Sequence, residues 1–449
     1  MATGQDLAAR RHTAAGHLVI SFGLAAVLVA SLAATTHAGK AKTQRMTVGT
    51  GGTEVAAGGQ DPAISATGQF VAFRSSDANI VGNDTNGKID VFIHNRKSRK
   101  TRRVSVRTDG GEAVGGTSDH PSVSGDGRFV AFESRATNLV NGDNNLKADI
   151  FVRDRKKKRT KRVSVRSNGA EAIGGDSSNP VISTNGRFVA FWSRATNLVS
   201  GDTNAVADVF VHDRKKKRTR RVSIRSNGSQ ANGGSTSPSI SADGRYVAFQ
   251  SAATDLVKND GNGATDVFVH DRKTRKTRRV SVSSNGAEAF DTSTKASISG
   301  NGRFVAFESL ADTLVGGDTN NVRDVFIHDR QKRRTKIVSL RSNGKQGGGT
   351  SDGASVSASG RFVAFSSRAE NLVRNDDNDV IDVFIRDRKA KKTRRVSVSS
   401  SRAQAVDGDN DEPAISADGR FVAFWSDAVN LIKNDGNGST DVFRRGPLR

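Results

Sequence analysis

The chain has 449 residues, with 70 lysines and arginines, 46 aspartates and glutamates, and no cysteine. The lack of cysteine excludes a disulfide framework, a cysteine-ligated zinc site and a thiol nucleophile. A hydrophobic fraction of 35% is sufficient for a large core, and a net charge of +24 favours anionic partners without specifying a fold.

Residues 1–38 are predicted to form a secretory signal peptide. Arg10 and Arg11 supply its basic region, an apolar stretch runs from Leu18 to Ala34, and Thr36-His37-Ala38 places small residues at a cleavage site. An uncleaved membrane anchor is the alternative, because the apolar stretch reaches the lower limit of a spanning helix. We favour cleavage, since the small residues directly follow the apolar run, and therefore expect a secreted or periplasmic protein.

One unit is repeated seven times in residues 39–449, with a period of 58 or 59 residues. The apolar segment that marks each unit reads Phe-Val-Ala-Phe or a close variant, and it begins at Phe70, Phe129, Phe188, Tyr246, Phe304, Phe362 and Phe421. A fixed period of this size indicates a propeller or a solenoid. The seven units leave no room for another domain within this range.

Each unit is predicted to contain four short strands. In the third unit these are residues 180–183, 188–192, 208–212 and 221–224, and Asn185-Gly186 is a tight turn between the first two. The second and third strands are apolar without strict alternation, as expected for strands buried on both faces. No amphipathic helical pattern follows the signal region, so we predict an all-β protein.

The two ends of the repeat region predict a closed ring. The last unit has its first three strands at residues 414–416, 421–425 and 441–443 but lacks a fourth. Residues 43–48 match the fourth strand of the other units in residue type. An N-terminal strand that completes the last blade removes the free sheet edges. We therefore predict a seven-bladed propeller of four-stranded blades.

The repeated pattern resembles a known family. Ser-x-Asp-Gly-Arg-Phe-Val-Ala-Phe, followed by Asp-Val-Phe-Val and Arg-Arg-Val-Ser, is similar to the WD-repeat-like units of TolB-type propellers. The resemblance implies the propeller fold and an exported bacterial protein. TolB has six blades and a separate α/β domain, so its role is not carried over, and no functional residue of the family matches a position in this chain.

The loop between the second and third strands reads Asp-x-Asn-x-x-x-Asp in every unit. These residues are Asp84, Asn86, Asp90, Asp143, Asn145, Asp149, Asp202, Asn204, Asp208, Asp260, Asn262, Asp266, Asp318, Asn320, Asp324, Asp376, Asn378, Asp382, Asp435, Asn437 and Asp441. Calcium prefers oxygen ligands of this kind, and the spacing resembles the short calcium loops of thrombospondin type 3 repeats and dockerins. We predict structural calcium sites here. The alternative is that these side chains only form turns.

The hairpin between the third and fourth strands is strongly basic. Six eight-residue windows, beginning at Arg96, Arg155, Arg214, Arg272, Arg330 and Arg388, hold 37 of the 70 basic residues. These hairpins lie on the face opposite the acidic loops, where they can bind an anionic envelope polymer or another envelope protein. The alternative is that they maintain solubility and protect outer strands. Nucleic acid is not expected, because Trp192, Trp425 and Tyr246 are too few for a stacking platform.

Enzyme signatures are weak in the sequence. Gly349-Thr-Ser351-Asp-Gly353 matches Gly-x-Ser-x-Gly, but no helix is predicted after it, as a nucleophile elbow requires. His94, His212, His270 and His328 recur at one strand position, whereas His120 stands alone in a predicted loop. A propeller active site should break the repeat symmetry at the central channel, and little asymmetry is recognised there.

From these observations we expect a non-catalytic, exported, monomeric binding scaffold stabilised by calcium, with no catalytic residues assigned. The alternative is a propeller enzyme, a lyase or hydrolase, that acts on an anionic polymer. Loss of polymer length over time distinguishes the enzyme from the scaffold.

Overall fold

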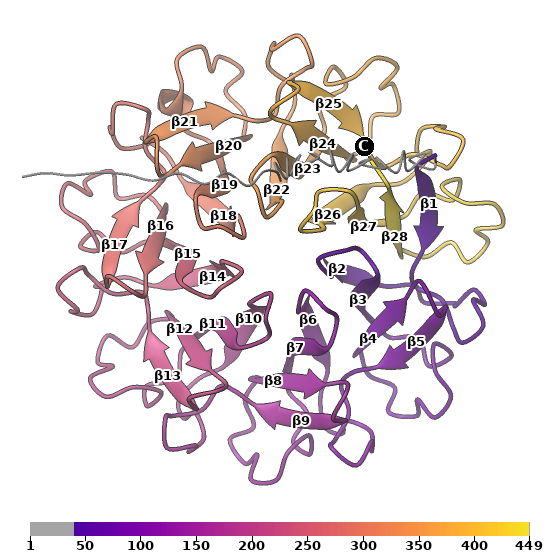
Figure 1. Cartoon of the computed structure of the whole chain (residues 1–449), viewed down its shortest axis with the longest axis vertical. Coiled ribbons are helices and arrows are strands. Elements are labelled where there is room, and N and C mark those ends of the chain that lie inside the picture. Colours follow the sequence, from indigo (N-terminus) through magenta and orange to yellow (C-terminus); the bar gives the residue numbers. More distant parts are fainter. Residues whose placement is uncertain (1–39, 449) are drawn as a thin grey trace, which may run out of the picture. The chain divides into compact units, whose positions relative to one another are not determined.

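The computed structural model describes residues 40–448. Seven four-stranded antiparallel sheets are arranged as blades around a common axis (Figure 1), which confirms the predicted seven-bladed propeller. The predicted signal peptide, residues 1–38, lies outside the described residues.

In six blades the four strands run outward from the axis in chain order, and in the seventh the outermost strand is β1. The innermost strands are β2 (Gln60–Ile64), β6 (Ser118–Val123), β10 (Ser177–Ile182), β14 (Ser235–Ile240), β18 (Ser293–Ile298), β22 (Ser351–Val356) and β26 (Asn410–Ile415). The second strands are β3 (Phe70–Ser75), β7 (Phe129–Ser134), β11 (Phe188–Ser193), β15 (Tyr246–Ser251), β19 (Phe304–Ser309), β23 (Phe362–Ser367) and β27 (Val422–Ser426).

The third and fourth strands form the outer half of each blade. The third strands are β4 (Asp90–Asn95), β8 (Asp149–Asp154), β12 (Asp208–Asp213), β16 (Asp266–Asp271), β20 (Asp324–Asp329), β24 (Asp382–Asp387) and β28 (Asp441–Gly446). The outermost are β5 (Lys100–Arg103), β9 (Arg159–Arg162), β13 (Arg218–Arg221), β17 (Lys276–Arg279), β21 (Arg334–Ile337), β25 (Lys392–Arg395) and β1 (Lys42–Arg45). In residues 40–448 the one helical segment is a 3-10 turn at Asp312–Leu314, and no helix there is long and apolar enough to cross a bilayer.

The ring closes as the sequence predicts. β1 pairs antiparallel with β28, so that Lys42 lies opposite Gly446 and Arg45 lies opposite Phe443. Figure 1 shows the indigo β1 beside the yellow β28. The seventh blade is thus built from both ends of the described chain, and no blade is left without its fourth strand.

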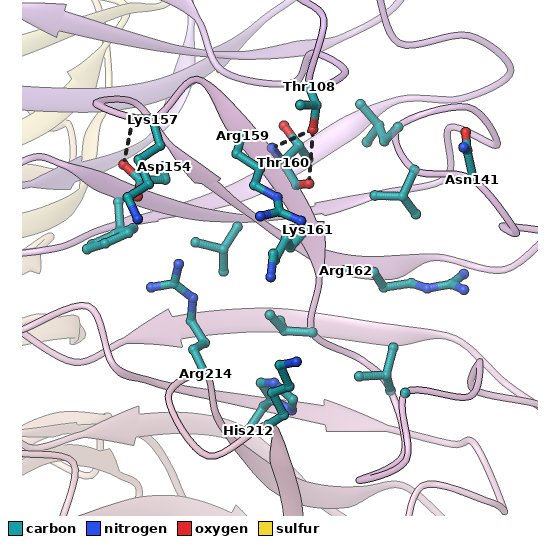
Figure 2. A pocket seen from close by; sticks show the side chains of 18 of the residues that line it. Thr108, Asn141, Asp154, Lys157, Arg159, Thr160, Lys161, Arg162, His212 and Arg214 are labelled. Atoms are coloured by element: carbon teal, nitrogen blue, oxygen red, sulfur yellow. Dashed lines mark hydrogen bonds between the residues drawn. The ribbon is translucent and has the colours of Figure 1, made fainter.

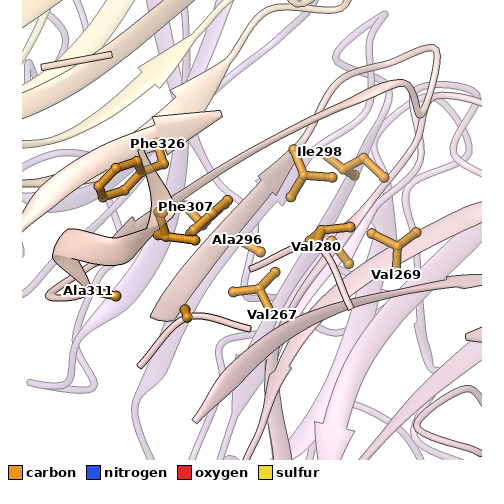
Figure 3. Packing of buried hydrophobic residues seen from close by; sticks show 12 residues of the cluster. Val267, Val269, Val280, Ala296, Ile298, Phe307, Ala311 and Phe326 are labelled. Carbon is orange, nitrogen blue, oxygen red and sulfur yellow. The ribbon is translucent and has the colours of Figure 1, made fainter. Parts of the chain in front are cut away.

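The core lies between neighbouring blades. Each blade contributes two phenylalanines on its second and third strands, and in the fifth blade the ring centroids of Phe307 and Phe326 are 5.9 Å apart. Val267 and Val269 of the fourth blade pack against this pair in one cluster (Figure 3). Burial of a large apolar side chain stabilises the fold by roughly 1.5–3 kcal/mol, so each blade depends on its neighbour for its core.

The innermost strands begin earlier than the sequence predicts. In the third blade the strand begins at Ser177 and not at Pro180, because a β-bulge interrupts the pairing of β10 with β11 between Ser178 and Val181. All seven inner strands carry this bulge. A bulge breaks the alternation of inward and outward side chains, which is the signal used to recognise a strand.

Candidate active site

Each bulge holds one residue in the left-handed backbone region, with φ between 47° and 60°. We call these seven residues the bulge ring: Asp61, His120, Asn179, Ser237, Lys295, Gly353 and Glu412. Six of the seven are not glycine, although positive φ is uncommon for such residues. Strained positions of this kind cluster at functional sites, and a bulge redirects a side chain.

The bulge ring is where the otherwise uniform units differ. Its seven positions carry seven different residue types. The facing position of the second strand also varies, and its residues are Arg74, Glu133, Trp192, Gln250, Glu308, Ser366 and Trp425. The sequence-based expectation of little asymmetry near the axis is therefore wrong. A column-by-column comparison of the seven units contains this signal. The inner strands were predicted to begin after the bulge, however, so the bulge residues were assigned to loops.

A hydrogen-bonded histidine and glutamate lie at the second blade. Nδ1 of His120 is 3.1 Å from Oε2 of Glu133. The hydrogen bond with Glu133 raises the pKa of His120 above its usual value, while burial opposes this shift. His120 remains exposed to solvent. It was predicted to be a loop residue, but it belongs to β6 and has a charged partner.

Glu133 also connects the second blade to the third. Its Oε2 accepts hydrogen bonds from the Ser178 hydroxyl and from the backbone N–H of Asn179, the latter at 3.4 Å. Nε1 of Trp192 donates to Oδ1 of Asn179 at 2.7 Å. These contacts fix Glu133 from two directions and so determine the position of His120.

A second titratable group lies where the seventh blade meets the first. The Glu412 carboxyl is exposed to solvent yet closely surrounded by protein atoms. This burial, followed by the charges of Asp61 and Asp411, raises the pKa of Glu412 to about 7. Nε of Arg74 lies 3.0 Å from Oδ2 of Asp61. Glu412 is therefore about half protonated near neutral pH.

Arg74 joins these two groups into one chain of contacts. Besides Asp61, it reaches Oδ1 of Asp119 in the second blade at 3.2 Å. Asp61 and Asp119 both act electrostatically on His120 and raise its pKa. Glu412 and His120 are thus linked through side chains of three consecutive blades. Each of the two groups has a raised pKa and a carboxylate partner at hydrogen-bond distance, features that general acid–base residues share.

The Gly-x-Ser-x-Gly motif is not part of this chemistry. Ser351 is fully buried in β22, and its hydroxyl is hydrogen-bonded to that of Ser367 at 2.9 Å. Gly353 is the bulge residue of the sixth blade. The four recurring histidines are also internal: His94 Nδ1 lies 2.9 Å from the Thr101 hydroxyl, which itself donates to the Val48 carbonyl at 2.7 Å.

The structure brings together the two aspartates of each predicted calcium loop, together with an arginine in six blades. In the first blade Nη1 of Arg103 lies 2.9 Å from Oδ1 of Asp84 and 3.3 Å from Oδ2 of Asp90. The equivalent arginines are Arg45, Arg162, Arg221, Arg279 and Arg395. Nδ2 of Asn86 donates to Asp90 at 2.8 Å, and its Oδ1 accepts from the backbone N–H of Lys88.

This arrangement limits where a calcium ion fits. In the first blade the single positive charge of Arg103 is shared by Asp84, Asp90 and Glu112, so it offsets only part of their negative charge, and its Nη1 competes with a cation for the same oxygens. The fifth blade differs, because Ile337 replaces the arginine and Nε2 of Gln346 donates to Asp318 at 2.6 Å and to Asp324 at 2.8 Å. Among the described residues neither aspartate has an ion-pair partner. Calcium binding stays a prediction: the first, second and fourth blades each place three carboxylates within reach of one ion but beside an arginine, whereas the fifth-blade loop has two carboxylates and no competing arginine.

Calcium is expected to stabilise the protein by binding in the loop between the second and third strands of the fifth blade. A site with a dissociation constant of ~0.1 mM would add about 1.4 kcal/mol at ~1 mM free calcium. We expect Asp318→Asn to abolish the calcium-dependent rise in Tm, and the matched change Asp84→Asn to retain it. The measurement is thermal unfolding with excess calcium and with a chelator. Equal Tm values for the unsubstituted protein under both conditions would leave these loops as turns only.

Comparisons with known proteins show the fold. No family model and no curated protein matches the sequence. An oligogalacturonate lyase from Vibrio parahaemolyticus matches with 11% identity and a TM-score of 0.53, over 92% of this chain and 94% of that chain. An oligogalacturonate lyase in complex with manganese matches with 11% identity and a TM-score of 0.51, over 91% of both chains. TolB from Acinetobacter baumannii matches with 14% identity and a TM-score of 0.40, over 86% of this chain and 82% of that chain.

These matches correct the functional expectation. At such identities they establish a shared propeller fold, as the resemblance to TolB-type repeats implied, and nothing about substrate. The two lyases share the fold over more than nine-tenths of their length, so the expectation of a non-catalytic scaffold is corrected in favour of its alternative, a propeller enzyme, which is taken up as a proposal below. The physical reason for the error is the bulge, which concealed the asymmetric residues of the inner strands.

Proposed function

We propose that the protein is a propeller enzyme that cleaves an anionic polymer, as a lyase or a hydrolase, at the bulge ring. The observation that carries this proposal is the chain of contacts from Glu412 through Asp61 and Arg74 to Asp119, the chain neighbour of His120, whose charge acts on that histidine. It lies where the repeated units differ, and it holds two proton-exchanging groups. The similarity in fold to two oligogalacturonate lyases supports the enzyme class.

The chemistry requires one group that removes a proton and one that donates a proton. In an elimination, a base takes a proton from carbon, a C–O bond breaks, a C=C bond forms and the leaving oxygen is protonated. In a hydrolysis, a base takes a proton from water while the water oxygen bonds to the sugar carbon, the C–O bond to the leaving group breaks, and the leaving oxygen is protonated. His120, oriented by Glu133, and Glu412 are suited to exchange these protons, because the pKa of His120 is raised by its hydrogen bond to Glu133 and burial raises the pKa of Glu412 to about 7.

The polymer is expected to be anionic because of charges outside the ring. The chain has a net charge of +24, concentrated in the hairpins between third and fourth strands. The ring and its facing residues are themselves rich in carboxylates, so Arg74 and Lys295 are the cations close to the reaction site. Most of the binding energy for an anionic chain must therefore come from other surfaces.

The proposal is tested by following polymer length. We expect the protein to shorten at least one of polygalacturonate, alginate and heparin, as measured by size-exclusion chromatography. A new ultraviolet absorbance of unsaturated ends would identify a lyase, and new reducing ends without that absorbance would identify a hydrolase. Binding of these polymers without any shortening would overturn the proposal, and so would cleavage restricted to neutral polymers such as dextran.

A further inference from the structure

A deep groove lies on the outside of the propeller between the second and third blades. It has a volume of about 1060 Å³ and is lined by the edge strand β9 and by His212, Arg214 and Lys217 of the third blade. Nine of its lining residues are arginine or lysine, whereas two, Asp109 and Asp154, are acidic. Figure 2 shows the side chains of Arg159, Lys161 and Arg214 in this groove.

The alternation of β9 places positive charges along the groove. Thr160 points inward, and its hydroxyl hydrogen-bonds to the Val106 carbonyl. Arg159 and Lys161, on either side of it, are exposed. Because β9 is the outermost strand of its sheet, its other edge has no partner strand. The Thr108 hydroxyl hydrogen-bonds the backbone N–H and C=O of Thr160 on that edge, so the groove offers a row of cations and not a free strand edge.

Several of these cations have no internal counter-ion. In the described part of the chain no carboxylate forms an ion pair with Arg159, Lys161 or Lys217, whereas Arg128 is paired with Asp154 at 2.8 Å. Burial lowers the pKa of Lys161, and the charges of Arg159 and Lys217 lower it further. Cations that repel one another in this way are stabilised when an anionic ligand enters.

The groove does not provide a surface for stacking bases. Phe129 is its one aromatic lining residue other than His212. The guanidinium carbons of Arg128 and Arg214 lie 4.6 and 4.2 Å from the Phe129 ring centroid, so arginines already cover this ring. Recognition of single-stranded nucleic acid relies on free aromatic faces.

We propose that this groove binds an extended strand of an anionic polysaccharide, as a subsite remote from the bulge ring. This inference rests on the proposed function. The groove would define the class of polymer and would explain how an enzyme with an acidic reaction site retains an anionic substrate. Carboxylate or sulfate groups along the strand would pair with Arg159, Lys161 and Lys217.

The fifth and sixth blades offer a matched comparison. The groove beside β21 has a volume of about 590 Å³, and Lys336 is its one charged lining residue. Arg334 and Lys336 occupy the positions of Arg159 and Lys161, and Lys391 occupies that of Lys217. Removing three cations at either place changes the net charge equally, so a difference between the two variants reports on the groove itself.

The test is the binding of fluorescein-labelled polygalacturonate, measured by anisotropy at several salt concentrations. Every protein carries Glu412→Gln so that the polymer is not cleaved. We expect the triple variant Arg159→Ala, Lys161→Ala, Lys217→Ala to lose about tenfold in affinity or more. The slope of log affinity against log salt concentration should fall in magnitude by about one for each contact removed. The control triple Arg334→Ala, Lys336→Ala, Lys391→Ala should lose less than about twofold.

Two outcomes would overturn the inference. Equal losses in both triples would mean that binding follows net charge, and tighter binding of a duplex DNA of equal charge would point to nucleic acid. The proposed function is judged separately, by cleavage of a short oligogalacturonate, which the groove triple alone should leave at its usual rate. Groove-dependent binding without cleavage of polygalacturonate, alginate or heparin would refute the enzyme but support the groove. Cleavage by a groove triple that binds with native affinity would support the enzyme but refute the groove.

Discussion

Replacing Glu412 by glutamine should lower the rate of polymer cleavage by about 10²- to 10⁴-fold. Glutamine preserves the shape of the side chain, but it cannot exchange a proton. The pKa of about 7, caused mainly by burial and then by Asp61, places Glu412 where small pH changes alter its protonation. The measurement is the initial rate of shortening of polygalacturonate across pH 5–9, giving kcat and KM for each protein.

The matched control is Glu370→Gln, an exposed glutamate in the loop between the second and third strands of the sixth blade. It should retain the full rate. In the unsubstituted protein one limb of the pH profile should fall near pH 7, and Glu412→Gln should remove it. An unchanged rate in Glu412→Gln would exclude Glu412 as a proton-exchanging residue.

Glu133 is expected to act as a positioning residue through His120. Its hydrogen bond raises the pKa of His120, so Glu133→Gln should lower that pKa and move the corresponding limb of the pH profile toward lower pH. A purely structural role would change stability and leave the limb in place.

The second large effect concerns ring closure. A chain that begins at residue 47 lacks β1 and should unfold at a much lower denaturant concentration than a chain that begins at residue 40. Nη1 of Arg45 lies 3.0 Å from both Asp435 and Asp441, whose side chains are 5% and 0% exposed. Loss of one partner from a buried ion pair costs about 3–5 kcal/mol, and the open edge of β28 adds to this cost.

Arg45→Met separates these two contributions, because it retains the strand and removes the charge. Arg103→Met is its matched control, since Arg103 makes the same contacts within the continuous first blade. We expect similar losses for the two point variants and a larger loss for the shortened chain, as measured by equilibrium unfolding in guanidinium. Equal stability of the two chain lengths would mean that β1 does not hold the ring closed.

The fold was largely predictable because it depends on local patterns that recur seven times. The apolar segments beginning at Phe70 and its equivalents, the Asn-Gly turn at Asn185 and the displaced fourth strand at residues 43–48 each limit the architecture independently. Repetition strengthens a weak strand signal, since an accidental pattern would not recur with a fixed period.

The candidate site was not predictable in the same way. His120 and Glu412 lie far apart in the chain, and only ring closure brings the seventh blade beside the first, through which Glu412 is linked to the second. The bulge also removes the alternation that would have identified their strands, so the functional positions resembled loop residues.

The sequence by itself thus determined the all-β class, the number of blades and the closure of the ring, because short-range hydrophobic patterns and turn residues encode them. Only the tertiary structure decided which side chains meet. It placed an arginine between the aspartates of six loops, left the fifth loop without one, and aligned Glu412, Asp61, Arg74 and His120 across three blades. Contacts between distant residues depend on backbone geometry, which sequence spacing does not specify.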